Sequence, residues 1–200
     1  MKRNVRFFGI ALSVLFAAGS LWTSAQTQDE QKIEKEKKKR ETYTAVAIGT
    51  GGRVGGRSMN LNFYIDEYTT DDQVREYLGV LQEKGNDGLR RVLEKVKVGR
   101  VAPAATTGTD LAIARKLITD TGQEIIRVVS ARPMPFLELY HGGRSTDYPF
   151  TIIELSLNPD GPGQGAVLGA AQLEFDDKGT LQIESYGNQY VKLTNVRIWD

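Results

Sequence analysis

The stretch SMNLNFYID, residues 58–66, carries the cleanest alternation of apolar and polar side chains in the chain. Successive side chains of an extended strand point to opposite faces, so a repeat of two residues is typical of β-structure. We expect a strand with one face in an apolar core and the other in solvent. The expected core face carries Met59, Leu61, Phe63 and Ile65, and the solvent face carries Asn60, Asn62, Tyr64 and Asp66.

Directly after this strand the repeat changes to that of a helix, about 3.6 residues. Thr70-Asp71-Asp72-Gln73 has the form of a capping box, with two acids near the positive end of the helix dipole. Two apolar series with helical spacing follow, separated by Gly85 and Asn86, and we expect Asn86 to cap the second helix. We therefore expect a helical hairpin at about residues 70–98, closed by Gly99, with its apolar stripe against the sheet. The two series are Val74, Tyr77, Leu78, Leu81 and Leu89, Val92, Leu93, Val96.

Short alternating segments separated by turn sequences indicate further strands after the helical region. The last segment changes phase near Thr194-Asn195, which predicts a β-bulge. Short links between successive strands favour antiparallel pairing. The fold class that we expect is α+β, an antiparallel β-barrel or sandwich of about nine strands with one inserted helical hairpin. Besides 43–48 and 59–65, the expected strands are 98–102, 110–118, 123–131, 148–158, 167–175, 181–184 and 190–199.

Residues 1–25 have the pattern of a signal peptide. Three basic residues precede an apolar run from Phe7 to Trp22, and small residues lead to an expected cleavage after Ala25. The run is shorter than the roughly 20 residues that a spanning helix needs, although a retained N-terminal anchor is the alternative. We expect an exported protein, periplasmic or secreted, with no membrane span in its mature form.

Residues 26–41 are mostly Gln, Glu and Lys, and Ile33 is their only large apolar residue. Such a segment buries too little to offset the entropy of ordering, so we expect a charged disordered linker before a single β-rich domain at 42–200. The chain contains no cysteine, so an apolar core has to stabilise it. Its 26 basic and 25 acidic residues nearly balance, and three of the bases lie in the expected leader. This balance argues against nucleic acid as a partner.

The most site-like residues lie in and after a proline-flanked aromatic segment. We expect a ligand-binding rim formed by Phe136, Tyr140, His141, Arg144 and Tyr148. His141 and Ser145 also allow a hydrolase hypothesis, but the chain has no Gly-x-Ser-x-Gly elbow and the two residues share one loop. One histidine and no cysteine exclude the usual zinc ligand sets, and we expect no metal and no other cofactor.

These patterns favour an exported, soluble, non-catalytic binding module. Its partner would be a small apolar or amphipathic ligand or an envelope protein, and its pocket would lie between the helical hairpin and the sheet or at a barrel mouth. Two alternatives stay open at this point. One is an envelope hydrolase that uses His141 as general base, and the other is a structural subunit that assembles through strand edges.

Overall fold

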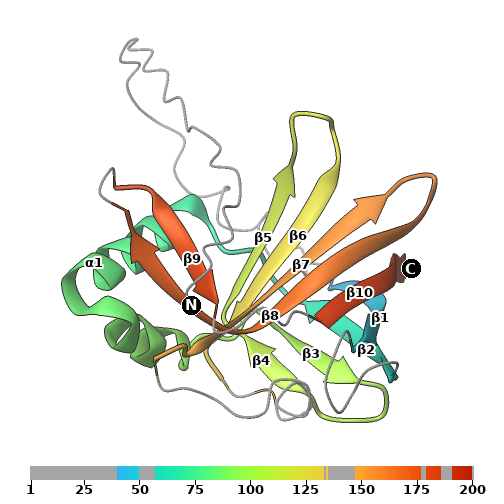
Figure 1. Ribbon diagram of the computed structural model, residues 1–200, viewed down its shortest axis with the longest axis horizontal. Helices are drawn as coiled ribbons and strands as arrows, with labels where there is room; N and C mark the ends of the chain where they lie inside the picture. Colours follow the sequence, from blue (N-terminus) through green and yellow to red (C-terminus); the bar gives the residue numbers. More distant parts are fainter. Residues whose placement is uncertain are drawn as a thin grey trace, which may run out of the picture.

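The computed structural model describes residues 40–49, 57–132, 134, 147–176, 179–185 and 191–199. The described part is mostly antiparallel sheet with a single helix, which confirms the α+β class (Figure 1). Its elements are β1 (Glu41–Ile48), β2 (Ser58–Ile65), α1 (Asp71–Leu93), β3 (Gly99–Pro103), β4 (Thr109–Leu111), β5 (Ile113–Ile118), β6 (Glu124–Ser130), β7 (Phe150–Asn158), β8 (Gly161–Phe175), β9 (Leu181–Ser185) and β10 (Val191–Trp199).

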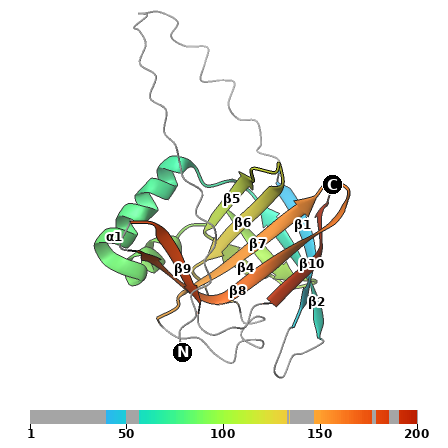
Figure 2. The same ribbon diagram turned by 45° about the horizontal axis from the view of Figure 1, so that its top comes forward.

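The strands form one sheet in the order β4-β3-β2-β1-β10-β8-β7-β6-β5, and β9 pairs with β8 outside this path. The hydrogen-bonded path is not a closed ring, because β4 and β5 stand at its two ends. These two strands are nevertheless consecutive in the chain, separated by Ala112 alone, whose N–H donates to the Val129 carbonyl on β6. A single residue therefore joins both ends of the sheet, and the sheet is strongly curled (Figures 1 and 2).

The sheet differs from the expectation in two places. The single strand expected over 110–118 divides at Ala112, because its first part pairs with β3 and its second part with β6. β8 begins at Gly161 rather than at 167, since the turn after Asn158 is short enough for pairing to resume at once. The bulge expected in β10 is confirmed: the pairing with both β1 and β8 shifts between Thr194 and Val196, and Asn195 has a φ of 53°.

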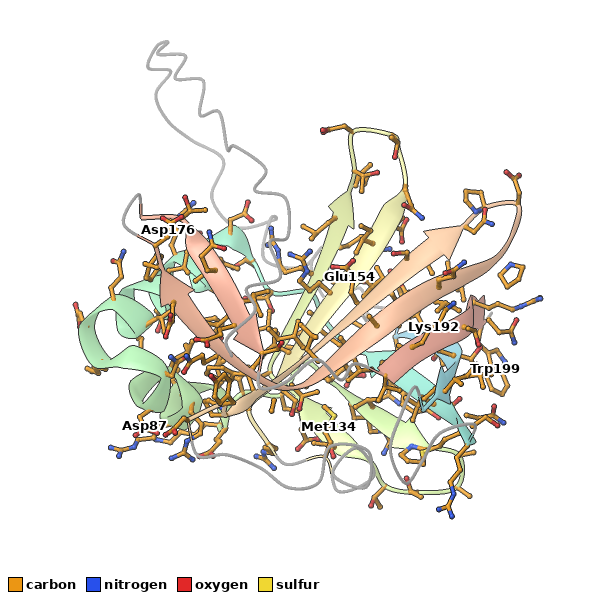
Figure 3. The ribbon with its side chains drawn as sticks, in the orientation of Figure 1. Asp87, Met134, Glu154, Asp176, Lys192 and Trp199 are labelled. Carbon is orange, nitrogen blue, oxygen red and sulfur yellow. The ribbon has the colours of Figure 1, made fainter. Side chains whose placement is uncertain are left out.

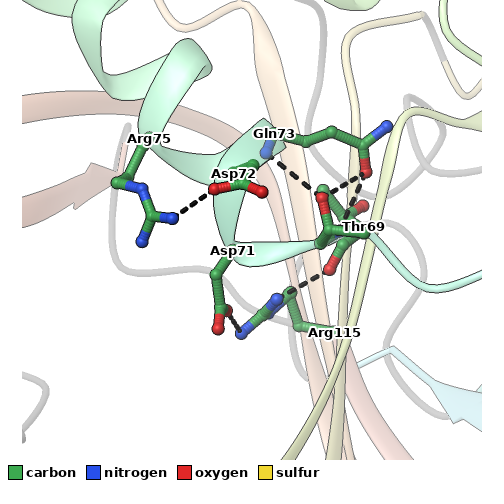
Figure 4. Close-up of polar contacts among 7 residues, drawn as sticks. Thr69, Asp71, Asp72, Gln73, Arg75 and Arg115 are labelled. Carbon is green, nitrogen blue, oxygen red and sulfur yellow. Dashed lines mark hydrogen bonds and ion pairs between the residues drawn. The ribbon is translucent and has the colours of Figure 1, made fainter. Parts of the chain in front are cut away.

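The start of α1 is fixed as the capping pattern predicts. Thr70 and Gln73 form a reciprocal capping box, in which the backbone N–H of each donates to the side-chain oxygen of the other (Figure 4). Arg115 of β5 connects this helix end to the sheet. Its guanidinium donates to the Thr69 carbonyl at 2.6 Å and forms an ion pair with Asp71. Among the described residues, no helix combines the length and apolar character needed to cross a bilayer.

The helical region is the single element α1, in which two helical parts meet at a kink; the expected break at Gly85 is confirmed, and the expected extension to residue 98 is wrong. Gly85 breaks it, with φ 63° and ψ −167°, a conformation that glycine adopts easily. Instead of capping a second helix, the Asn86 side chain bonds the backbone of β8. Its Nδ2 donates to the Leu173 carbonyl at 3.0 Å, and its Oδ1 accepts from the Leu173 N–H at 2.9 Å. The element ends at Leu93, before the expected stop at Gly99, which instead begins β3.

Two apolar clusters lie on opposite faces of the curled sheet. The inner cluster fills the concave side with alternating strand residues, as the pattern in 58–66 predicts. The outer cluster packs the stripe of α1 against the convex side, which confirms that the helix covers the sheet. Large inner members are Tyr43, Leu61, Phe63, Ile65, Leu111, Ile126, Ile153 and Leu155, and the outer cluster includes Tyr77, Leu81, Leu89, Leu93, Val129, Phe150 and Ile152.

Candidate binding site

A polar cluster, which we call the Glu41 cluster, lies where β1 begins. The Glu41 carboxylate accepts hydrogen bonds from the phenols of Tyr43 and Tyr68, the latter at 2.6 Å. The two phenol oxygens are 3.0 Å apart. Each phenol has a single proton, so a hydrogen bond between them would replace one of the two bonds to Glu41. Lys116 of β5 places its Nζ 3.1 Å from Glu41 and 3.3 Å from Glu124 of β6. The Glu41 cluster therefore connects four separate segments across one end of the curled sheet.

Glu41, Tyr43, Tyr68 and Lys116 keep their ordinary charge states at neutral pH. Burial raises the pKa of Tyr43 and of Tyr68, and their bonds to Glu41 raise both further. Burial alone would raise the pKa of Glu41 too, but the bonds from both phenols and Lys116 outweigh it and lower that pKa. Burial opposes the charge of Lys116, yet Glu41 and Glu124 raise its pKa overall. The cluster thus offers fixed charges and hydrogen bonds, rather than a proton to exchange near pH 7.

A groove of about 720 Å³ adjoins the Glu41 cluster and crosses the rim of the sheet. Because successive side chains of a strand point to opposite faces, the groove has lining residues on both faces of the sheet. Ile198 lies on the concave side, beside the Glu41 cluster, and Trp199 lies on the convex side. Trp199, which is 63% exposed, and Ile198, which is 53% exposed, end β10 at this rim, where Figure 3 labels Trp199. We call this hollow the rim groove; its lining residues are Arg40, Glu41, Thr42, Tyr64, Lys116, Glu124, Ile198 and Trp199.

The convex part of the rim groove is a row of side chains on neighbouring strands. Thr42 of β1 pairs with Tyr64 of β2 on one side and with Trp199 of β10 on the other. A small side chain thus lies between two aromatic ones. The guanidinium of Arg100 stacks on Tyr64 at 4.8 Å from the ring centre, and that of Arg40 lies at 5.8 Å. Two guanidinium groups thus lie over the Tyr64 ring, which lines the groove.

A second hollow, of about 630 Å³, adjoins the rim groove and shares Glu124 and Ile198 with it. It lies among the β5–β6 turn, the β7–β8 turn and the end of β10. The remaining lining residues are Gly122, Leu157, Asn158, Pro159, Asp160, Gly161, Val196 and Arg197. Together the two hollows form an elongated open surface at one end of the sheet.

Of the binding residues expected from the sequence, the structure places Tyr148. Its phenol donates to Glu184 at 3.2 Å, beside the start of β7, whereas the rim groove lies at the other end of the curled sheet. Burial, and then Glu184, raise the pKa of Tyr148. The other expected residues, Phe136, Tyr140, His141 and Arg144, lie outside the described residues, and so does Ser145. The hydrolase hypothesis and the strand-edge hypothesis both stay predictions.

Sequence reasoning missed the rim groove, although the sequence carried a signal for it. Glu41, Lys116 and Glu124 each occupy the apolar, inward-facing parity of their strand, at its end. A charged residue on the core face of a strand needs a partner, so three such residues predict a shared polar site. The other expected location, between α1 and the sheet, is packed in the described residues by buried apolar side chains.

Among the residues that the structure describes, no group of three or more acidic or histidine side chains is arranged to hold a metal ion. Comparison of the chain with protein-family models, with curated proteins and with solved structures found no match. The geometry of the rim groove is therefore the basis for assigning a function.

Proposed function

We propose that this protein is an exported, non-catalytic binding module that takes an amphipathic ligand in the rim groove. The observation that carries the proposal is the groove itself, in which exposed Trp199 and Ile198 adjoin the fixed charges of the Glu41 cluster. An apolar surface next to ordered polar groups is the usual composition of a ligand site. The concave side of the sheet is filled by its own side chains, so the ligand binds at the rim.

Trp199 gives a direct test of this proposal. Trp22 and Trp199 are the two tryptophans of the chain, so the variant Trp22→Phe makes the indole in the groove the sole tryptophan reporter. We expect a saturable blue shift of its emission with at least one member of a panel of decanoate, octyl glucoside and neutral oligosaccharides, because a ligand would remove water from the exposed ring. The Tyr148→Phe change at the opposite end should leave the titration unaltered. No saturable shift with any member of the panel would overturn the proposal.

Export has its own test, because it rests on residues 1–25. Expression in a bacterial host with an intact secretion system should yield a mature chain that begins at Gln26, as measured by intact mass. Recovery of the unprocessed chain in the membrane fraction would show that the segment is retained as an anchor.

A further inference from the structure

The charges that line the rim groove cancel one another. Lys116 lies between Glu41 and Glu124, and Arg40 pairs with Asp66 at 2.6 Å. An ionic ligand would lose part of its hydration on entering the groove. Because Arg40 and Lys116 are already paired with acids, no new ion pair would offset the free-energy cost of that desolvation. The groove therefore favours a ligand without net charge.

Two aromatic walls stand on either side of Thr42. Tyr64 and Trp199 belong to strands that flank β1, so their Cα atoms are about two interstrand spacings apart, about 10 Å. The negative face of an aromatic ring attracts weakly positive C–H groups. Arg40 and Arg100 already lie over the Tyr64 ring, whereas Trp199 is exposed. A saturated ring with one C–H face and polar edges fits on the Trp199 ring, and its edge groups would meet the polar lining of the groove.

Glu124 brings a carboxylate to the lining of both hollows. Its Oε1 lies 3.3 Å from Lys116 Nζ, in an ion pair. A carboxylate accepts several hydrogen bonds, so a ligand hydroxyl can donate to Glu124 beside Lys116, whereas an aliphatic chain cannot.

From these three observations we infer that the ligand is a neutral oligosaccharide. The inference rests on the proposed function and names the ligand class of the same site. One sugar ring packs against Trp199 beside Tyr64, and its hydroxyls bond Glu124 and the rim. The chain of sugars continues into the second hollow, which shares Glu124 and Ile198 with the rim groove.

The test is a titration of the full-length Trp22→Phe protein with cellohexaose, maltohexaose and chitohexaose, and separately with decanoate and inorganic phosphate. We expect at least one oligosaccharide to shift the emission saturably, with a Kd that is unchanged between about 0.05 and about 0.5 M salt because the ligand has no charge to screen. Neither decanoate nor phosphate should compete with that oligosaccharide.

Variants then locate the sugar by calorimetry. Trp199→Ala and Glu124→Gln should each weaken binding at least about tenfold, the first by removing the stacking face and the second by removing the charged acceptor. Glu184→Gln, at the other end of the sheet, is the matched control and should bind as the parent does. Each variant is checked by thermal melting; because Trp199 is exposed, its loss should leave the fold intact.

The outcomes separate the two proposals. A shift with decanoate or phosphate and none with the three oligosaccharides would overturn the carbohydrate inference and leave a binding groove of another kind. Equal oligosaccharide affinity in parent, Trp199→Ala and Glu124→Gln would also overturn it. No shift with any of the five probes or with octyl glucoside would overturn both the carbohydrate inference and the binding function.

Discussion

Glu41→Gln is the substitution that probes the Glu41 cluster most sharply, because it removes a charge while keeping the shape of the side chain. The carboxylate accepts from Tyr43 and Tyr68 and pairs with Lys116. Tyr43 is fully buried, so its phenol loses a charged acceptor without gaining water. Hydrogen bonds to charged groups contribute about 1.5–3 kcal/mol, and Gln keeps a neutral acceptor, so we expect a loss of about 1–3 kcal/mol at pH 7.

The lowered pKa of Glu41 determines how the stability difference between the parent and Glu41→Gln changes with pH. The pKa of Glu41 is lower in the folded state than its ordinary value of 4.5, so the carboxylate binds fewer protons in the folded than in the unfolded chain. Its stabilisation is therefore complete above pH 4.5 and is lost as the pH falls through the folded-state pKa. The stability gap between parent and Glu41→Gln should be largest at neutral pH and should shrink under acid conditions.

Urea unfolding at a series of pH values measures this gap, and Glu83→Gln on the exposed side of α1 is the control for a general charge effect. For a domain of this size, each kcal/mol corresponds to a fall in Tm of about 2–4 °C. The reasoning would be refuted if Glu41→Gln matched the parent at pH 7, or if the gap stayed constant down to the acid end of the series.

Three further changes test how the fold is held. Asn86→Ala removes both side-chain bonds to the Leu173 backbone and should lower the free energy of unfolding by about 1–3 kcal/mol in urea, and an unchanged value would show that the bend of α1 is held in another way. Gly163→Ala would put a Cβ 2.0 Å from the Ser156 carbonyl oxygen on β7, so overpacking should cost about 1–3 kcal/mol by thermal melting, and a neutral effect would contradict this close approach. Gly79→Ala lies in a helical part of α1 with open space around the new methyl group, so it should raise the free energy of unfolding by about 0.5–1 kcal/mol in the same melt. A loss of stability would show that this part of α1 is not helical in solution.

The elements that local patterns determine could be predicted from the sequence. The alternation in 58–66 specified β2 and its buried face, and the Thr70–Gln73 box specified where α1 begins. Gly85 was expected to stop a helix and does break one. The phase change at Thr194-Asn195 was a correct sign of the bulge, because an extra residue shifts every later side chain to the other face.

Features that depend on long-range pairing could not be predicted in this way. Nothing in the composition around Ala112 shows that one continuous segment serves as both ends of the sheet. The partner of Asn86 lies 87 residues away, so capping looked equally suitable from local sequence. The rim groove brings together residues of β1, β2, β5, β6 and β10, and their adjacency follows from the strand order rather than from spacing along the chain.

A chemical-shift map of the ¹⁵N-labelled protein, titrated with the oligosaccharide that shifts Trp199 emission most strongly, tests the site most directly. Our account predicts that the largest changes fall on 40–42, 64, 116–124 and 196–199, the segments that surround the rim groove. Changes centred on α1 and β9, with the end of β10 unaffected, would contradict it.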